Sequence, residues 1–158
     1  MMTRTATLHA ATTLVERVEA VLEGLSRFPA AILQFLLRLS IASVFWHSGM
    51  TKIASWDTTI VLFRDEYMVP ILPPELAAGL AATVELTCPV LLILGLATRL
   101  ATLPMLGMTF VIEVFVYPEQ WIEHLMWASI LVFILTRGPG AFSVDHLLAG
   151  KFLRGRNR

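Results

Sequence analysis

The sequence predicts an all-α polytopic membrane protein, a bundle of four membrane-spanning helices with an N-terminal amphipathic helix and a short capping helix in the first outer loop. The mean hydropathy is +0.72, and 56% of the residues are hydrophobic, against roughly 45–50% in soluble domains. Four apolar stretches are long enough to cross a bilayer, which takes about 20 residues per helix. The 12 basic and 12 acidic residues balance, so overall charge gives no support to a nucleic-acid partner.

The chain divides into a short N-terminal segment, one membrane domain and a tail. Val18, Val21, Leu22 and Leu25 recur at helical spacing among charged residues, which is typical of an amphipathic helix and not of a cleavable signal sequence. Such a helix can lie at the membrane surface, and a solvated helix packed on the bundle fits the pattern equally well. The predicted segments are the amphipathic residues 1–28, the four-span domain 29–146 and the basic cytoplasmic tail 147–158.

Proline, glycine and charged residues mark the ends of the four spans. The first span begins after Pro29, and the second follows a proline-rich stretch that ends at Pro74, where the missing N–H costs a helix nothing. The loop between them contains Trp56, Phe63 and Tyr67, which is too apolar for a free linker and predicts the short capping helix. The spans are expected at residues 30–53, 74–96, 99–116 and 120–136.

The distribution of basic residues predicts the orientation, because Lys and Arg are retained on the cytoplasmic side. Only Lys52 and Arg64 fall on one side of the four-span arrangement. The other side collects most of the basic residues: Arg4, Arg17, Arg27, Arg99, Arg137, Lys151, Arg154, Arg156 and Arg158. We therefore expect both termini in the cytoplasm and the loop from about residue 54 to 73 outside.

Five ionisable residues lie at membrane depth, namely Arg38, His47, Glu85, Glu113 and His124. A charge near the centre of a bilayer costs about 3 kcal/mol on insertion scales, so such groups normally face a protein interior. We predict that the two His and two Glu converge in the outer half of the bundle as the candidate catalytic residues. Such a pocket could take up a proton, hold a quinone head group or bind a metal. Each residue could also be structural, for example Glu85 as a protonated acid bonded to a neighbouring helix.

Three further groupings follow from the same placement. Lys52 lies just beyond His47 and could pair with a carboxylate. His47, His124 and Glu113 suit a metal by ligand type, although they come from separate segments with no local ligand motif. Arg38 lies deep enough to pair with Asp145 after the last span, or else to extend its guanidinium to the membrane surface.

Several enzyme classes have no support in the sequence. Cys88 is the only cysteine, which excludes an intrachain disulfide and a CxxC redox pair. The chain has no nucleophile triad, phosphate-binding glycine loop, haem-attachment motif or dinucleotide fingerprint. Electrons would therefore need an exchangeable carrier or a partner protein.

Three sequence elements between about residues 34 and 145 resemble the DoxX family of bacterial inner-membrane proteins. The first is Arg38-Leu39 followed by Phe45, Gly49 and Lys52. The second is Glu85 followed by the Leu-Gly-Leu-Ala-Thr-Arg of residues 94–99, and the third is the Gly-Pro-Gly-Ala-Phe-Ser-Val-Asp of residues 138–145. The resemblance implies a four-helix membrane protein with signature residues at Arg38, Lys52, Glu85 and Asp145. His47, Glu113 and His124 lie outside those motifs.

The resemblance also implies a link to redox chemistry, because members of the family are named for a small subunit associated with thiosulfate:quinone oxidoreductase, and others for oxidative-stress or metal-stress systems. We therefore expect a membrane subunit with protein partners, such as an accessory subunit of a quinone-dependent oxidoreductase, with Glu85 in the site and with Lys52 and Arg38 as cofactor contacts. The alternatives are the handling of a metal ion or small solute, and a non-catalytic scaffold for soluble partners. Family membership alone does not establish catalysis.

Overall fold

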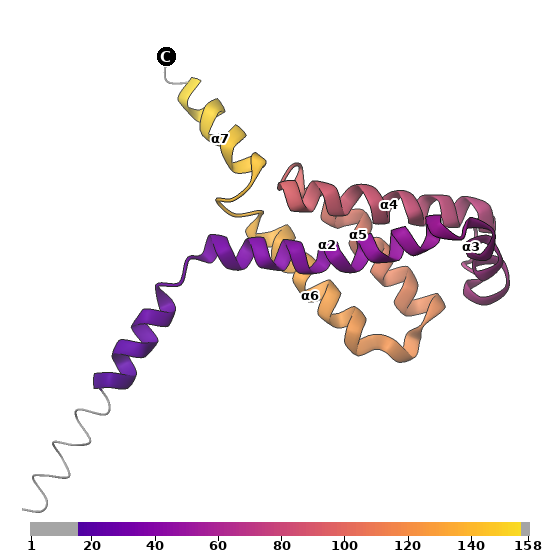
Figure 1. Cartoon of the computed structure of the whole chain (residues 1–158), viewed down its shortest axis with the longest axis horizontal. Coiled ribbons are helices and arrows are strands. Elements are labelled where there is room, and N and C mark those ends of the chain that lie inside the picture. Colours follow the sequence, from indigo (N-terminus) through magenta and orange to yellow (C-terminus); the bar gives the residue numbers. More distant parts are fainter. Residues whose placement is uncertain (1–15, 156–158) are drawn as a thin grey trace, which may run out of the picture. The chain divides into compact units, whose positions relative to one another are not determined.

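The computed structural model describes the backbone of residues 16–155 and the side chains of residues 16–150. Every regular element in that part of the chain is a helix, which confirms the predicted fold class. Figure 1 shows the order of the elements. From residue 30 onward they are α2 (Ala30–Ala54), α3 (Trp56–Leu62), the π-helical turn η1 (Phe63–Tyr67), α4 (Pro74–Leu94), α5 (Thr98–Val111), the π-helical turn η2 (Ile112–Val116), the 3₁₀ turn η3 (Pro118–Gln120), α6 (Trp121–Arg137) and α7 (Val144–Gly155).

Three helical stretches are long and apolar enough to cross a membrane, namely α2, α4, and α5 together with η2. The fourth predicted span is α6, whose 17 residues reach the lower end of the length that a spanning helix needs, about 17–25 residues. It packs along α5, which in turn packs along α4. All four helices begin and end within two residues of the predicted spans.

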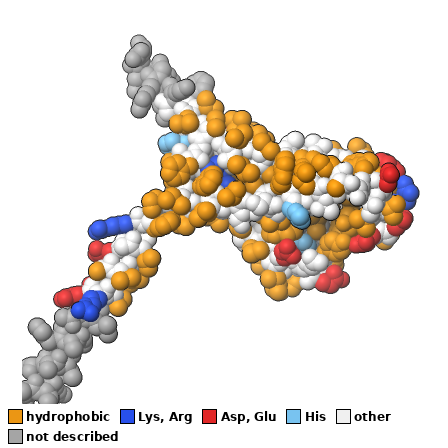
Figure 2. Space-filling view, viewed as in Figure 1, with side chains coloured by type: hydrophobic (Ala, Val, Ile, Leu, Met, Phe, Trp, Pro, Cys, Tyr) orange, Lys and Arg blue, Asp and Glu red, His pale blue; other side chains and the backbone are white. Residues whose placement is uncertain are grey.

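The four helices share one apolar core, with many other apolar side chains left on the outside. Both are expected where lipid replaces water, because lipid tails accept apolar side chains as readily as a protein interior does. Apolar side chains dominate the visible surface of the bundle, shown in orange in Figure 2. The buried core consists of Ile41, Ala42, Phe45, Cys88, Leu92, Ala101, Met105, Leu131 and Ile134.

Helices α2 and α4 approach closely at Gly49. A Cβ atom at this position would lie 3.0 Å from the Cβ of Glu85 and 2.9 Å from the Cδ2 of Leu86. Small residues allow this kind of backbone approach between membrane helices. Gly49 therefore determines how near α2 comes to the carboxylate on α4.

The predicted capping helix is present as α3 and η1. Phe63 is buried against Ala77 and Ala78 of α4, with Tyr67 and Ile60 packed beside it. This packing holds the segment on the bundle, so that it covers one end, which we call the capped end. The opposite end, where α7 begins, is the α7 end.

The two terminal segments are described separately. Residues 16–26 are helical, and the apolar side chains of Val18, Val21, Leu22 and Leu25 are exposed. The rest of the predicted amphipathic segment lies outside the described residues. At the other terminus, most of the predicted basic tail belongs to the helix α7.

Gly95 ends α4 with a φ of +69°, a conformation that favours glycine. A Cβ atom there would lie 2.8 Å from the Cα of Ser143 and would also clash with the Arg38 guanidinium. We expect Gly95→Ala to lower the free energy of unfolding by about 3 kcal/mol, from backbone strain and steric overlap together. The measurement is equilibrium unfolding in detergent micelles, followed by circular dichroism.

The control is Gly79→Ala in the interior of the same helix, where no atom lies within 4 Å of the added Cβ. Replacing a mid-helix glycine by alanine stabilises a helix by up to about 1 kcal/mol. Equal stabilities for the two variants would contradict the role assigned to Gly95.

Candidate functional site

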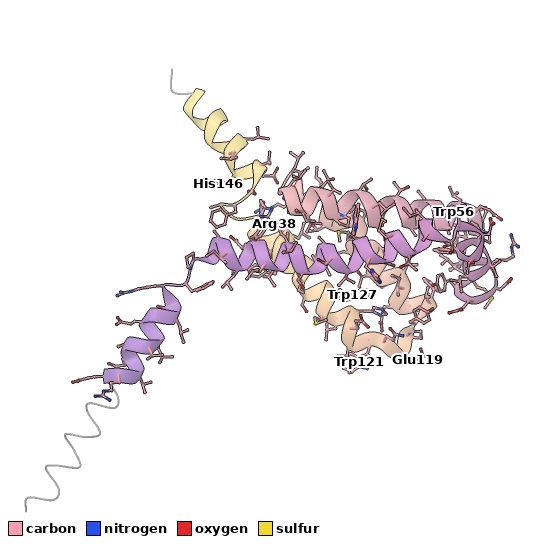
Figure 3. All side chains as sticks on the ribbon, viewed as in Figure 1. Arg38, Trp56, Glu119, Trp121, Trp127 and His146 are labelled. Atoms are coloured by element: carbon pink, nitrogen blue, oxygen red, sulfur yellow. The ribbon has the colours of Figure 1, made fainter. Side chains whose placement is uncertain are left out.

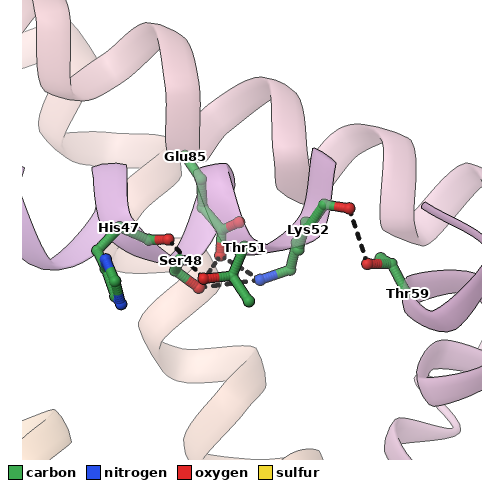
Figure 4. A network of polar contacts seen from close by, with 6 residues as sticks. All are labelled: His47, Ser48, Thr51, Lys52, Thr59 and Glu85. Atoms are coloured by element: carbon green, nitrogen blue, oxygen red, sulfur yellow. Dashed lines mark hydrogen bonds and ion pairs between the residues drawn. The ribbon is translucent and has the colours of Figure 1, made fainter. Parts of the chain in front are cut away.

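A largely buried ion pair inside the bundle joins Lys52 of α2 to Glu85 of α4. The ammonium Nζ of Lys52 donates to Oε1 of Glu85 at 2.8 Å and to the hydroxyl of Ser48 at 3.0 Å. The Ser48 hydroxyl donates to the same Oε1, also at 3.0 Å. Figure 4 shows the three side chains meeting between the two helices. This interhelical ion pair supports the predicted pairing of Lys52 with a carboxylate.

Local sequence explains why these groups meet. Ser48 and Lys52 are four residues apart on a helix, so they lie on one face, one turn from each other. Gly49 lets the backbone of α4 approach that face. The Thr59 hydroxyl donates to the carbonyl of Lys52 at 3.0 Å, satisfying one of the unpaired carbonyls at the end of α2. The start of α3 is thereby tied to the helix that carries the lysine.

Glu85 is only 2% exposed, and its two carboxylate oxygens differ in their environment. Oε1 accepts both hydrogen bonds, whereas Oε2 is buried and has no partner among the described residues. An unpaired buried acceptor costs about 1–3 kcal/mol, and more when it is charged. Glu85 therefore has an unsatisfied acceptor.

A second pair joins α6 to the end of α5. Nδ1 of His124 lies 2.6 Å from Oε2 of Glu113. His124 is 3% exposed and packs edge-to-face on Trp127 at a centroid distance of 5.1 Å. Glu113 lies in the π-helical turn η2, a feature that is frequent at functional sites. The predicted convergence of Glu113 with His124 is thus present in the geometry.

The Lys52–Glu85 pair and His124 border one cavity of about 390 Å³ near the capped end. Ser48 and Lys52 of α2 and Glu85 of α4 line it, as do His124 and Trp127 of α6. Glu113 does not line the cavity and reaches it only through His124. Most of the remaining wall is apolar: Phe63, Val69, Leu72, Ala77, Leu80, Ala81, Val84, Pro104, Met108, Val111, Ile112 and Val116. An apolar cavity with few polar groups is the usual form of a small-molecule site.

His47 does not join this group. Its side chain is exposed and lines a separate cavity of about 300 Å³, which shares Ser48, Lys52, Phe63 and Tyr67 with the first. In Figure 4 the His47 side chain lies to one side of the Glu85 network. The contact drawn to His47 is the hydrogen bond that its backbone carbonyl accepts from the Thr51 hydroxyl. The described residues contain no group of three His, Cys, Asp or Glu able to hold a metal. The expected set of His47, His124 and Glu113 is therefore not assembled.

Arg38 lies at the α7 end of the bundle, away from the cavity. It is fully buried and donates from Nη1 to the carbonyl of Leu92 at 3.0 Å and from Nη2 to the carbonyl of Phe142. Figure 3 shows it at the opposite end from Trp56. A rise of about 1.5 Å per residue puts it about 20 Å along α2 from Lys52. Arg38 thus does not border the cavity that Lys52 lines, whereas we expected both residues to contact one cofactor.

The predicted salt bridge between Arg38 and Asp145 is absent from the described side chains. Asp145 instead accepts hydrogen bonds from the backbone N–H groups of Ala97 and Thr98, at 2.8 and 2.9 Å. Its own N–H donates to the carbonyl of Gly95 at 2.9 Å. Burial opposes ionisation, but the two N–H donors outweigh it, and the pKa of Asp145 is lowered. Asp145 thus binds the turn between α4 and α5, whereas Arg38 joins the last turn of α4 to the segment between α6 and α7.

An aromatic group near the capped end was not anticipated from the sequence. The Tyr117 hydroxyl donates to Oε1 of Glu66 at 2.6 Å, which raises the pKa of the phenol. Tyr67 packs edge-to-face on Tyr117 at 5.8 Å and on Phe63 at 5.0 Å. Tyr67 and Tyr117 also line the larger cavity. Nothing in the spacing of Glu66 and Tyr117 indicated this contact, because it joins two separate loops.

Comparison with known families now identifies the chain. The DoxX family profile matches residues 33–118, more than half of the sequence. The chain belongs to the DoxX family. The matched region of this DoxX protein contains Lys52 and Glu85, whereas His124 and Asp145 lie beyond it. Searches of curated proteins and of solved structures gave no match.

The Lys52–Glu85 pair provides a test of the buried network. We expect Lys52→Met to lower the free energy of unfolding by about 3–5 kcal/mol, because it leaves a buried carboxylate without its counter-charge. The double variant Lys52→Met, Glu85→Gln should recover most of this loss, since no charge then remains. The measurement is equilibrium unfolding in detergent micelles.

The control is Arg64→Met, which removes the exposed pair that Arg64 forms with Glu75 at 3.1 Å. Exposed pairs contribute up to about 1 kcal/mol. If Lys52→Met cost no more than this control, the carboxylate of Glu85 would not depend on Lys52.

Proposed function

We propose that this DoxX protein is an integral membrane subunit of a redox system and that its larger cavity holds the head group of a quinone. The observation that carries the proposal is a single apolar cavity with the Lys52–Glu85 pair on one part of its wall and His124, paired with Glu113, on another. A quinone combines the same two properties, since it has an apolar ring and tail with polar oxygens at opposite edges. When bound, it would supply the capacity to carry electrons and protons within the membrane.

The residues on the cavity wall suit such a group. An ammonium has three donors, and Lys52 uses two of them on Ser48 and Glu85, so one is free for an oxygen of the ligand. The apolar side chains of Val84 and Met108 can pack on the ring. Glu85 and His124 are groups that can hold or release a proton next to the bound oxygens. Electrons would come from a partner protein, because Cys88 is the only cysteine.

The other two functions receive less support. Metal handling would need more ligands than the His124–Glu113 pair that the described residues bring together. A purely structural scaffold would give the buried polar groups no reason to border a cavity, and it would leave Oε2 of Glu85 unpaired without benefit. The quinone site, metal handling and the scaffold all place the protein in the bilayer. We also propose that it has protein partners in a membrane complex.

Co-purification of quinone tests the proposal directly. Protein isolated from native membranes in mild detergent should contain stoichiometric quinone, measured by organic extraction and chromatography. Ala81→Phe places a ring in the cavity and should remove the quinone. Thr83→Phe, at an exposed position of the same helix, should not. Protein without quinone, together with unchanged activity of the parent complex in Ala81→Phe, would overturn the proposal.

We further propose the bacterial inner membrane as the location, with both termini in the cytoplasm and α3 outside, because basic residues favour the cytoplasmic face. Thr58 of α3 and His146 of α7 are both exposed. With Cys88 replaced by serine, a membrane-impermeant maleimide should label Thr58→Cys in intact cells, and should label His146→Cys only after permeabilisation. The reverse pattern would invert the topology.

A further inference from the structure

The larger cavity begins where the apolar core between α4 and α5 ends. Cys88 of α4 and Met105 of α5 are buried in that core. Val84 and Met108, about one helical turn further toward the capped end, line the cavity. The two helices pack together and are joined by a short turn, so they are antiparallel and these residues lie at similar depths in the membrane. The cavity therefore extends between α4 and α5, beyond the level of the core.

Helices α4 and α5 separate toward the capped end. The segment that continues α5 is η2, whose main contacts are with α5, η3 and η1 and not with α4. Figure 1 shows α5 running away from α4 as it approaches α6. Pro104 lies inside α5, where a proline removes a backbone hydrogen bond and favours a bend. The space between the two helices therefore widens toward the capped end.

Two apolar residues of the cavity wall are also exposed on the outside of the bundle. Leu80 of α4 is 50% exposed, and Pro104 of α5 is exposed as well. Residues with both properties mark an opening of the cavity. Leu80 lies about 9 Å along α4 from Pro74, and Pro104 about 9 Å along α5 from Thr98. Both positions are inside stretches long enough to cross a membrane, so this opening faces the hydrocarbon of the bilayer.

A second opening of the cavity is polar. Gln120 and Glu123 also line the cavity and are exposed, and they lie at the start of α6, near the capped end. The volume of about 390 Å³ is near the lower end of the range for drug-sized ligands, about 300–1,000 Å³, so a long chain must extend out of the cavity. At Leu80 such a chain passes into lipid, whereas at Gln120 it would meet water and polar groups, which is unfavourable for a hydrocarbon.

We infer that the ligand is a lipid-soluble quinone with a long hydrocarbon chain, which enters from the bilayer and leaves its chain between α4 and α5 at Leu80, Val84 and Met108. The inference rests on the proposed function and adds the chemical class of the ligand's chain and its route of entry. The head group then lies among the polar residues of the wall, and the chain occupies the opening that faces lipid.

Cysteine protection tests the inference. Leu80→Cys lies at the opening, and the matched control Leu76→Cys lies one turn away on α4; the two leucines are 50% and 51% exposed, and Leu76 does not line the cavity. Each variant has Cys88 replaced by serine, is freed of endogenous quinone and is reacted with a maleimide in detergent micelles. A benzoquinone with a long alkyl chain, at about ten times its Kd, should slow the reaction of Leu80→Cys by about tenfold, because only about a tenth of the protein is then free. It should not slow Leu76→Cys, and the benzoquinone without the chain should protect neither.

Binding of both benzoquinones is measured on the same variants by equilibrium dialysis. If the long-chain benzoquinone binds and the two cysteines still react at equal rates, the inference is wrong and the proposed function stands. Protection of Gln120→Cys instead of Leu80→Cys would place the chain in the polar opening and also refute the inference. Equal protection of Leu80→Cys by an alcohol with the same chain but no ring would assign the opening to ordinary lipid chains, with the same consequence. If neither benzoquinone binds, the inference and the proposed function both fail.

Discussion

The ion pair between Lys52 and Glu85 is the interaction on which the arrangement of the site depends. A carboxylate in the middle of a membrane helix is costly when it faces lipid or an apolar core alone, and an ammonium 2.8 Å away offsets part of that cost. The pair also fixes the rotation of α2 against α4, because both side chains must point into one interface. Gly49 then allows the separation that this contact needs. The buried ion pair and the close helix packing are in this way properties of the same few residues.

A second polar cluster holds the helices together at the other end. Arg38 binds the carbonyls of Leu92 and Phe142, while Asp145 caps the first N–H groups of α5. The apolar core lies between the two clusters along α2, from Ile41 to Phe45. The bundle is therefore fixed by polar contacts at two levels and filled by apolar packing between them. Such an arrangement can keep a cavity open near the capped end without loosening the helices that form it.

Placement by depth agrees with part of the observed geometry. Glu85, Lys52 and His124 border one cavity, as their positions along the spans indicated. His47 has nearly the same depth as Ser48, yet one residue turns a helix by about 100°. Ser48 therefore faces α4, whereas His47 lies outside that interface. In a membrane helix both the lipid-facing and the protein-facing sides are apolar, so hydropathy gives little indication of which side a polar residue occupies.

The sequence by itself determined the fold class, the ends of the helices, the family and the presence of ionisable residues that lipid would not tolerate. These properties depend on local composition, on the length of apolar stretches and on short motifs. Only the tertiary structure decided that Lys52 pairs with Glu85 and that Glu113 pairs with His124. It also decided that Arg38 and Asp145 bind backbone groups of different segments instead of each other. Those outcomes depend on the rotation of each helix about its axis and on the close approach of other segments to Gly49 and Gly95. Contacts between residues far apart in the sequence determine both.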